Sequence, residues 1–468
     1  MVTSQPLPDA ATASETLAGF AARLDFAALP TAVVESVKLH VLDTVGVALA
    51  AARQDFTHAA IAGVTEWCGG EGQCGVIGRP ERLPAPWAAL VNGTLAHGLD
   101  FDNTHQESVV HVSAGVVPAA LAVGEQCRAD GRSVIAAIAA GEETSIRIGL
   151  AAHGAFHDRG FHPTGICNTF GAATAAGKLA GLSADAYTHA LGVCGSQAAG
   201  LFAFLTDGTW VKRLHGGWAA HGGIVAAALA RHGFTGPRAV LDGRFGLYHT
   251  HLGDSGWDLA AVTAQLGERW ELVRTALKPY PCCHYNHAFI DALAALQKGH
   301  SWAAAEVEHV ACVLADRQVP IVCEPLATKR HPQTDYDAKF SLPYAVACQI
   351  VRGHVDVDDY SDAAIRDPAI LDLAARVSYE SDPAADFPRR FGGRVRVRLR
   401  DGRVLAHAEP INRGSAERPL TADEVIDKFR RSAAGVLPSA KIDAVQAAIA
   451  SLERLDDIAL LMTALQPD

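Results

Sequence analysis

The sequence lacks the features that would direct a protein to a nucleic acid or into a membrane. Its 40 lysines and arginines are outnumbered by 51 aspartates and glutamates, for a formal net charge of -11, whereas nonspecific nucleic-acid binding needs basic patches. No uninterrupted apolar run reaches the roughly 18 residues of a membrane helix, and no basic segment followed by an apolar one opens the chain. We therefore expect a cytoplasmic protein without nucleic-acid or membrane partners. A locally cationic pocket for an anionic substrate is still compatible with this charge.

Closely spaced cysteines and several well-known catalytic motifs are also missing. Ten cysteines occur, but none forms a Cys-x-x-Cys pair, so zinc knuckles, thioredoxin-type motifs and iron–sulfur clusters have no support. In a chain of this length we expect these cysteines to be reduced and mostly buried. The sequence has no GxGxxG loop, P-loop, GxSxG elbow or HExxH helix, which argues against nucleotide-dependent, serine-hydrolase and zinc-protease chemistry.

What the sequence does contain is alanine-rich helical periodicity. With 468 residues, 49% of them hydrophobic, the chain is globular and long enough for two domains. One helix face is marked within 32–51 by valines spaced three and four residues apart: Val34, Val37, Val41 and Val45. Alanine is the best helix former, and similar Ala- and Leu-rich segments predict helices at about 85–98, 114–127, 132–152, 168–181, 184–199 and 217–232.

The pattern changes after the KPYP segment at 278–281. Residues 307–314 look like a strand, and 394–408 alternate apolar and basic side chains around an Asp401-Gly402 turn, which predicts a hairpin covered on one face only. Helical stretches near 341–352 and 362–375 lie between them. From Thr421, a plausible helix cap, the pattern is helical to the end. The order is therefore helical, then mixed α+β, then helical.

The stretch 97–111, HGLDFDNTHQESVVH, concentrates proton carriers in an otherwise apolar region. On a helix, Asp100 and Thr104 would share a face, with His97 one turn earlier. Three interpretations follow: a cation held by His97, Asp100 and a later histidine, a polar helix end, or an acid–base site. The spacing matches no zincin or EF-hand pattern, which disfavours the metal. The segment alone does not decide between the other two.

Three further segments place cations or proton carriers beside proline or glycine. His162, in GFHPTG, is expected on a loop above a helix N-terminus, a position suited to anion or proton chemistry. Lys212, in VKRLHGG, would share a helix face with His215. Lys278, in KPYPCC, sits on a proline-stiffened hinge at the proposed domain boundary, where ligand sites often lie. Taken singly, the His162 segment favours a capping or surface histidine, and the Lys212 segment a solvated basic turn, the commoner fate of Lys and Arg. The alternative for Lys278 is a surface lysine in an ordinary interdomain linker.

In this order the segments resemble the MmgE/PrpD family, and the resemblance spans nearly the whole chain. The matching stretches are HGLDFDNTH (97–105), GFHPTGICNTFGAATAAGKLAGL (160–182), Lys212-x-x-His215-x-Gly217 ending in ARHGFTGP, KPYPCC with His287 and Ile290-Asp291-Ala292, and KFSLPYAVA (339–347). The resemblance implies a mainly α fold with an α+β lid. Its all-helical domain would comprise 1–275 and 415–468, and its lid 276–414. A homodimer, an active site between domain and lid, and no metal or cofactor are also implied.

Matching positions extend the resemblance to individual residues. It implies catalytic roles for His111, Asp100, Thr104, Lys212 and Lys278, and substrate-binding roles for His162, Lys212 and Lys278. Three departures stand out. The family commonly has His-Pro-Ser where this chain has His111-Val112-Ser113, its DFDDT is here DFDNT, and a pocket tyrosine of the decarboxylase lid has no evident counterpart near 319–325. The last departure weakens a direct transfer of decarboxylase activity.

The resemblance implies a cofactor-independent lyase for a small di- or tricarboxylate. Proton removal next to a carboxylate, or loss of CO2, adds negative charge that lysines in a closed site stabilise better than water does. We expect His111, oriented by Asp100 or Thr104, to move the proton. The first hypothesis is a hydro-lyase similar to 2-methylcitrate dehydratase, and the second is a cis-aconitate-type decarboxylase or iminodisuccinate-type epimerase. The third, a non-catalytic binding protein, is disfavoured because the lysines and histidines of the pocket are retained.

Overall fold

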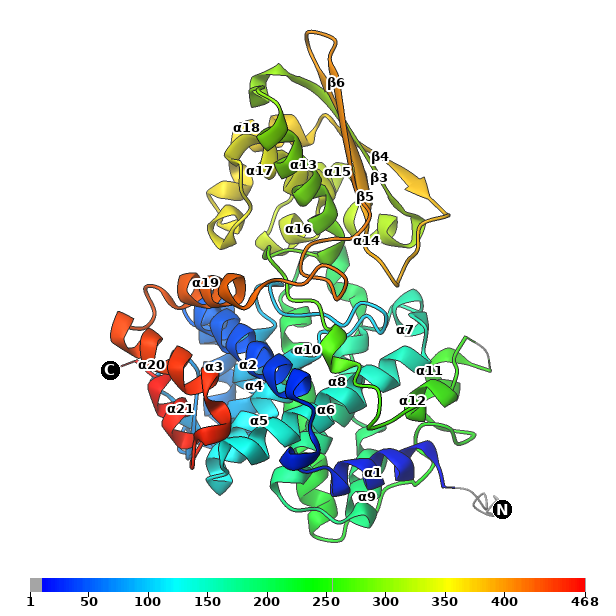
Figure 1. Cartoon of the computed structure of the whole chain (residues 1–468), viewed down its shortest axis with the longest axis vertical. Helices are drawn as coiled ribbons and strands as arrows, with labels where there is room; N and C mark the ends of the chain where they lie inside the picture. Colours follow the sequence, from blue (N-terminus) through cyan, green and yellow to red (C-terminus); the bar gives the residue numbers. More distant parts are fainter. Residues whose placement is uncertain (1–10, 255, 468) are drawn as a thin grey trace.

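The computed structural model describes residues 11–254 and 256–467, and its larger part is a body of packed helices (Figure 1). The first 270 residues supply α1 (Ala13–Arg23), α2 (Thr31–Ala51), α3 (Asp55–Cys68), α4 (Ala85–Ala96), α5 (Ser113–Cys127), α6 (Gly131–Ala151), α7 (Ala155–Asp158), α8 (Pro163–Leu179), α9 (Ala184–Cys194), α10 (Val211–Arg231), α11 (Leu247–Leu252) and α12 (Ala260–Thr263). Two very short strands, β1 (Cys74–Gly75) and β2 (Arg82–Leu83), interrupt them. The predicted helices are confirmed, although the 184–199 segment stops at residue 194.

Small residues let the central helices cross at short range. Helices α4 and α10 meet at Gly93 and Gly217, and a Cβ built on Gly217 would lie 2.1 Å from the carbonyl oxygen of Leu90. Any larger side chain there would push the helices apart. The valine face predicted within α2 is buried, with Val37, Val41 and Val45 fully inaccessible. The alanine- and glycine-rich composition therefore serves close helix packing.

The C-terminal segment returns to the same body. It forms α19 (Ala422–Ala433), α20 (Ser439–Ala450) and α21 (Ala459–Ala464), and α19 packs on α2 (Figure 1). Thr421 caps α19 as predicted, because its hydroxyl accepts a hydrogen bond from the Glu424 backbone N–H while the Glu424 carboxylate accepts one from the Thr421 N–H. Both chain ends thus contribute to one hydrophobic core.

Between them, the chain forms a smaller α+β lobe with its own core. Its elements are α13 (His287–Gly299), β3 (Val307–Ala315), α14 (Val319–Val322), α15 (Leu326–Arg330), α16 (Asp335–Lys339), α17 (Leu342–Arg352), α18 (Pro368–Ala374), β4 (Val377–Asp382), β5 (Gly393–Leu399) and β6 (Val404–Glu409). The strand order is β4-β3-β5-β6, with β3 parallel to β4 and the other pairs antiparallel. Strand β4 was not predicted, because its sequence lacks clear alternation.

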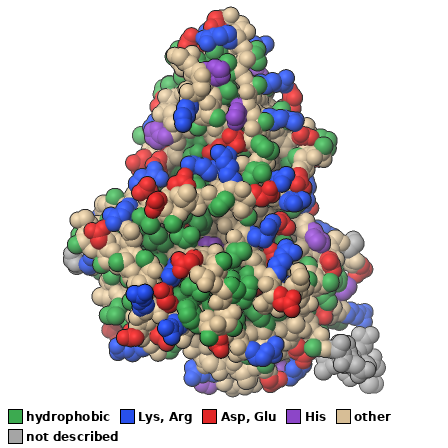
Figure 2. Space-filling model, in the orientation of Figure 1, with side chains coloured by type: hydrophobic (Ala, Val, Ile, Leu, Met, Phe, Trp, Pro, Cys, Tyr) green, Lys and Arg blue, Asp and Glu red, His purple; other side chains and the backbone are tan. Residues whose placement is uncertain are grey.

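The predicted hairpin with one covered face is confirmed. Val395, Val397 and Leu399 are buried, while the arginines between them point to solvent. Helices α13 and α17 lie on the apolar side of the sheet (Figure 1). Acidic side chains pair with the exposed arginines, as Glu380 does with Arg396 at 3.0 Å. Acidic and basic side chains are likewise interspersed over the face seen in Figure 2.

A mainly helical fold with a small α+β part is therefore established. The predicted domain boundaries at 275/276 and 414/415 lie close to where the chain passes between the two cores, but they stay a prediction. No helix in the described part of the chain is both long and apolar enough to cross a bilayer. One local expectation was wrong: α4 ends at Ala96 and α5 begins at Ser113, so most of 97–111 is a loop rather than a helix.

Candidate active site

A cavity between body and lobe brings together all six residues singled out in the sequence. The body, together with the segment at 276–281 that leads from it into the lobe, contributes Asp100, Thr104, Val109, His111, His157, His162, Phe202, Lys212 and Lys278. The lobe contributes Cys283, His284, Tyr285, Ile321, Phe340 and Phe391. The cavity therefore has a polar, titratable wall on the body side and a largely aromatic wall on the lobe side.

The loop at 97–111 is held at the cavity by backbone hydrogen bonds to the segment that leads from the body into the lobe. Thr104 and Ala276 exchange two hydrogen bonds, at 2.9 and 2.8 Å. Asp100 adopts a positive φ of 54°, a conformation that aspartate tolerates better than most residues. This turn brings the Asp100 carbonyl within 2.9 Å of the Lys278 Nζ. Asp100 and Lys278 are thus placed by the loop rather than by a helix face.

Asp100 pairs with both lysines of the site. One carboxylate oxygen contacts the Lys212 Nζ, and the other lies 3.3 Å from the Lys278 Nζ. All three side chains are at most 2% exposed. Burial would raise the pKa of the Asp100 carboxyl, but Lys212 and Lys278 together outweigh it and hold this pKa far below its ordinary value. Asp100 is therefore a permanent carboxylate that anchors two ammonium groups at the cavity wall.

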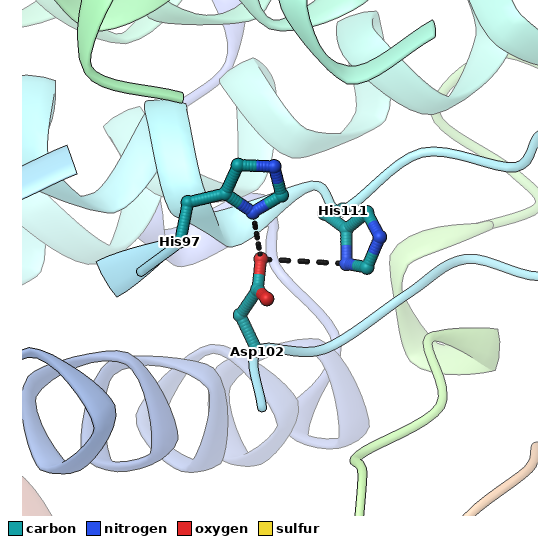
Figure 3. Close-up of side chains that lie close together, drawn as sticks. All are labelled: His97, Asp102 and His111. Carbon is teal, nitrogen blue, oxygen red and sulfur yellow. Dashed lines mark hydrogen bonds and ion pairs between the residues drawn. The ribbon is translucent and has the colours of Figure 1, made fainter. Parts of the chain in front are cut away.

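A second carboxylate, Asp102, orients two histidines (Figure 3). Its Oδ2 lies 2.7 Å from the His97 Nδ1 and 3.3 Å from the His111 Nδ1. The His111 Nδ1 also lies 3.1 Å from the Asn103 carbonyl oxygen and 3.2 Å from the Thr104 hydroxyl. A carboxylate and a carbonyl can only accept, so the His111 Nδ1 carries the proton. Its Nε2, which has no hydrogen-bond partner among the described residues, is left with a free lone pair.

Helix α8 fixes the backbone of His111 from the other side. The Thr164 hydroxyl accepts a hydrogen bond from the His111 N–H at 3.1 Å, and the Asn168 side chain donates one to the His111 carbonyl at 2.9 Å. Thr164 and Asn168 lie one turn apart on the same helix face. His111 is thus held at both its backbone and its Nδ1. Thr104 contacts its ring as expected, whereas Asp100 faces the lysines instead.

Two further histidines complete the body wall. His162 directly precedes α8, as predicted, and its Nδ1 lies 2.8 Å from the Nδ1 of His215, one turn after Lys212 on α10. The His162 ring also stacks on His97, with centroids 5.4 Å apart. Because one Nδ1 must donate to the other, both rings cannot be protonated there. Burial, together with the neighbouring cationic and imidazole groups, holds the pKa of His162 well below its ordinary value.

The free site is close to electrically balanced. Burial is the main cause that lowers the pKa of His111 to about 4, with Lys212 and Lys278 adding to it and Asp102 opposing it. Burial also lowers the pKa of His215 to about 3. The histidines are therefore neutral near pH 7, so the positive charges of Lys212 and Lys278 balance the negative charges of Asp100 and Asp102. Binding of a polyanion would raise the histidine pKa values and draw protons into the site.

A buried lysine from the C-terminal segment ties the two site loops together. The Lys428 Nζ donates to the carbonyls of Phe101 and Lys278, at 2.7 and 3.0 Å. It also pairs with Asp43 on α2 at 2.6 Å and lies 3.8 Å from the Phe101 ring centroid. The two carbonyls belong to the segments that carry Asp100 and Lys278. Lys428 therefore positions the Asp100–lysine cluster without reaching the cavity.

His97, Asp102 and His111 also meet the distance requirement for a metal site, because their ligand atoms lie within 4.8 Å of one another. Both Nδ1 atoms, however, face the same Asp102 oxygen at hydrogen-bond distance (Figure 3). A metal held there would have to displace both hydrogen bonds and the Nδ1 protons. The metal set considered from the sequence included Asp100, which the structure places against the two lysines instead.

Sequence reasoning left several contributing residues unassigned. Asp102 lies inside the DFDNT run, but its role depends on the loop that brings His97 and His111 to one carboxylate. His215 was noted beside Lys212, yet its contact with His162 needs the packing of α10 against α8. The histidine and tyrosine after KPYPCC, His284 and Tyr285, line the cavity from the lobe, and no pattern in the sequence marked them. Tyr285 and Ile321 line the same cavity, so its lobe wall carries a tyrosine although the resemblance found none near 319–325.

Comparisons with known proteins agree with this architecture. The model of the MmgE/PrpD N-terminal domain matches residues 15–260, and that of the MmgE/PrpD C-terminal domain matches 280–454. A cis-aconitate decarboxylase-like protein of Aspergillus oryzae is 27% identical over 451 residues, which cover 93% of each chain. A cis-aconitate decarboxylase of Aspergillus terreus is 27% identical over 93% of this chain and 92% of its own. The cis-aconitate decarboxylase of Mus musculus is 26% identical over 96% and 92%.

Proposed function

The chain belongs to the MmgE/PrpD family, and on that premise we propose that it is a lyase that decarboxylates a small unsaturated tricarboxylate of the cis-aconitate type. The relatives named above support this choice over the dehydratase that the sequence alone favoured. The observation that carries the chemistry is the pairing of two buried lysines with a carboxylate-oriented histidine in one cavity.

Decarboxylation makes specific demands that this cavity meets. Loss of CO2 leaves the bonding electrons on the remaining fragment, and one of its carbons must then take one proton: R–COO⁻ + H⁺ gives R–H + CO2. In an unsaturated tricarboxylate the developing charge spreads toward a neighbouring carboxylate. Lys212 and Lys278, held by Asp100, supply fixed positive charge where water is largely excluded. These lysines stabilise the transition state more than the bound substrate, because negative charge grows near them as CO2 leaves.

His111 is the proposed proton donor. Its Nε2 is free, while its Nδ1–H is held by Asp102 and the Asn103 carbonyl. In the substrate-free site the ring is neutral, with its pKa lowered to about 4 mainly by burial. The negative charges of a bound tricarboxylate favour the imidazolium, so substrate binding loads the ring with the proton that the carbanion needs. His162, beside the same cavity, is the proposed additional contact for a substrate carboxylate.

A hydro-lyase is the second candidate, and the lone pair on the His111 Nε2 favours it. A neutral imidazole oriented by a carboxylate is suited to abstracting a proton next to a carboxylate. Dehydration then expels the hydroxyl as water, with the same proton or another one returned to it. An epimerase would use the same abstraction and return the proton to the opposite face of the carbon.

A substrate panel distinguishes these reactions. The protein is incubated with cis-aconitate, citrate and 2-methylcitrate, while absorbance near 240 nm reports unsaturation and a coupled assay reports CO2. The proposal expects CO2 from cis-aconitate. New absorbance from the saturated acids without CO2 would favour the hydro-lyase, and α-proton exchange in D2O without net turnover would favour an epimerase. Inactivity across the panel would refute both lyase candidates.

We also propose that the protein is a homodimer that uses the outer face of α10. Large apolar side chains spaced three and four residues apart are exposed on this face: Val211, Leu214 and Trp218. Leu229 and the adjoining Trp210 extend the same apolar face. Light scattering of wild type should give twice the chain mass, and Trp218→Lys should shift it toward the monomer. A monomeric wild type would refute the proposal. The cytoplasm stays the predicted location.

A further inference from the structure

His284 is a buried histidine of the cavity to which neither the sequence reasoning nor the proposed mechanism assigns a role. It opens a short 3-10 turn, His284–Asn286, just after the KPYPCC segment, and is 4% exposed. Its ring borders the cavity from the lobe side, across from the wall that carries Lys212 and His111. It packs edge-on against Phe391, with centroids 5.2 Å apart. Among the described residues that line the lobe wall, His284 therefore supplies the imidazole.

The protonation state of its Nε2 follows from the neighbouring amide. Asn412 lies on the segment that returns from the lobe to the body, and its Nδ2 is 2.7 Å from the His284 Nε2. The same Nδ2 lies 3.3 Å from the Arg413 carbonyl oxygen, which can only accept. Its Oδ1 accepts from the Gln106 Nε2 at 3.1 Å. Both contacts fix the Asn412 amide as a donor toward His284, so the His284 Nε2 is an acceptor and carries no proton.

The proton of the neutral ring must then lie on Nδ1. This nitrogen is buried and has no hydrogen-bond partner among residues 11–254 and 256–467. Burial, with His287 and Lys278 adding to it, holds the pKa of the His284 ring well below its ordinary value, so the ring is neutral near pH 7. An unpaired buried donor is costly to a fold. In a ring that borders a ligand cavity, a bound molecule is the partner that would satisfy it.

We propose that His284 is a substrate-binding residue whose Nδ1–H donates a hydrogen bond to a carboxylate oxygen of the bound polycarboxylate, and that the Gln106–Asn412 amide pair is a positioning relay that fixes this tautomer. The inference rests on the proposed function, because the acceptor is the substrate. Gln106 belongs to the body loop that also carries Asp100 and Thr104. The loop that holds the two lysines through Asp100 therefore also fixes, through Gln106 and Asn412, the tautomer of His284 on the lobe side.

This arrangement defines what the lobe wall recognises. Lys212 and Lys278 bind negative charge on one side of the cavity, while a neutral N–H on the other side prefers an oxygen acceptor. A substrate with carboxylates at both ends satisfies both walls, whereas one whose far end is a methyl group leaves the Nδ1–H unpaired. A hydrogen bond to a charged acceptor is worth about tenfold to a hundredfold in binding. His284 thus selects for a second or third carboxylate.

The tautomer is tested by 15N NMR of the full-length protein labelled at histidine, with the His284 signals assigned by their loss in His284→Gln. The expected wild-type pattern is a pyrrole-type Nδ1 and a pyridine-type Nε2. In Asn412→Asp a carboxylate replaces the amide donor, and the His284 Nε2 is expected to become protonated. A wild-type protein whose Nε2 is already protonated would overturn the relay. A merely structural role for Asn412 would not move this signature.

Substrate contact is tested with two matched variants. The amide of His284→Asn falls near the position of Nδ1, and that of His284→Gln near Nε2. With cis-aconitate, His284→Gln is expected to raise KM about tenfold to a hundredfold, with a smaller change in kcat, and His284→Asn to recover part of the loss. Thermal unfolding midpoints confirm that the compared variants are folded. If wild type turns over cis-aconitate and both variants match its KM, this inference alone fails. If wild type neither binds nor converts any polycarboxylate, both the proposed function and this inference, which depends on it, are refuted.

Discussion

Replacing Asp102 by asparagine isolates the acid–base step from substrate binding. In the native site the Asp102 Oδ2 accepts from the Nδ1–H of His97 at 2.7 Å and of His111 at 3.3 Å. The asparagine keeps the shape of the side chain but removes its charge, and its amide can offer a donor where His111 needs an acceptor. The tautomer with its proton on Nε2 then becomes competitive, and the cavity faces the wrong form of the ring.

The expected loss follows from what an oriented acid–base group contributes. General acid–base catalysis is worth about 10²- to 10⁴-fold, so kcat of Asp102→Asn should fall by that factor, or about 2.7–5.4 kcal/mol of transition-state stabilisation. KM should change less than kcat, because Lys212 and Lys278 are held by Asp100 and not by Asp102. The Asp102 charge opposes the lowering of the His111 pKa, so this pKa should move further below about 4 in the variant.

The assay is steady-state turnover of cis-aconitate over a range of pH, with Asp100→Asn as the matched control two residues away. Asp100→Asn leaves the Asp102–histidine contacts intact and disturbs both lysines, which bind the substrate and stabilise the developing charge, so it should raise KM as well as lower kcat. Asp102→Asn with a kcat close to that of wild type would refute the assignment of His111 as a proton carrier oriented by this carboxylate. A pure KM effect would refute it equally.

Three other outcomes are expected from the same geometry. Lys428→Met should lower the free energy of unfolding by about 3–5 kcal/mol in chemical denaturation, because it leaves the buried Asp43 charge unpaired. The double variant with Asp43→Leu should recover much of this loss, and a single variant as stable as wild type would contradict the expectation. If His111 donates the proton, kcat should fall as pH rises through the pKa that the ring has with substrate bound, which lies above the value of about 4 in the free site; a kcat that instead falls on acidification would indicate proton abstraction. Activity should survive exhaustive chelation, and a loss restored by one added metal would assign His97, Asp102 and His111 to that metal.

The sequence predicted most of the fold because its helices and its hairpin carry strong local patterns. The valine face of α2, the cap at Thr421 and the alternation in β5 are properties of neighbouring residues, and tertiary packing preserved all three. The helix considered for 97–111 did not form. There, the chain turns at Asp100 with a positive φ, and backbone hydrogen bonds to Ala276 replace those of a helix.

The site was predictable only as a set of residues, and not as a set of contacts. The resemblance singled out six side chains that do share a cavity, but it could not show that Asp100 faces two lysines while Asp102 faces two histidines. These pairings are decided by loop conformation and by helix crossings distant in sequence. Lys428 and His284 were missed for the same reason, since their partners lie more than a hundred residues away.

The most direct test of the decarboxylase account is the stoichiometry of cis-aconitate turnover in D2O. The proposed reaction predicts one CO2 per cis-aconitate consumed and one deuterium added to the carbon of the product that is protonated, both detected by NMR and gas analysis. Consumption of cis-aconitate with no CO2, or with water added across its double bond, would contradict the account and assign the same cavity to a hydro-lyase.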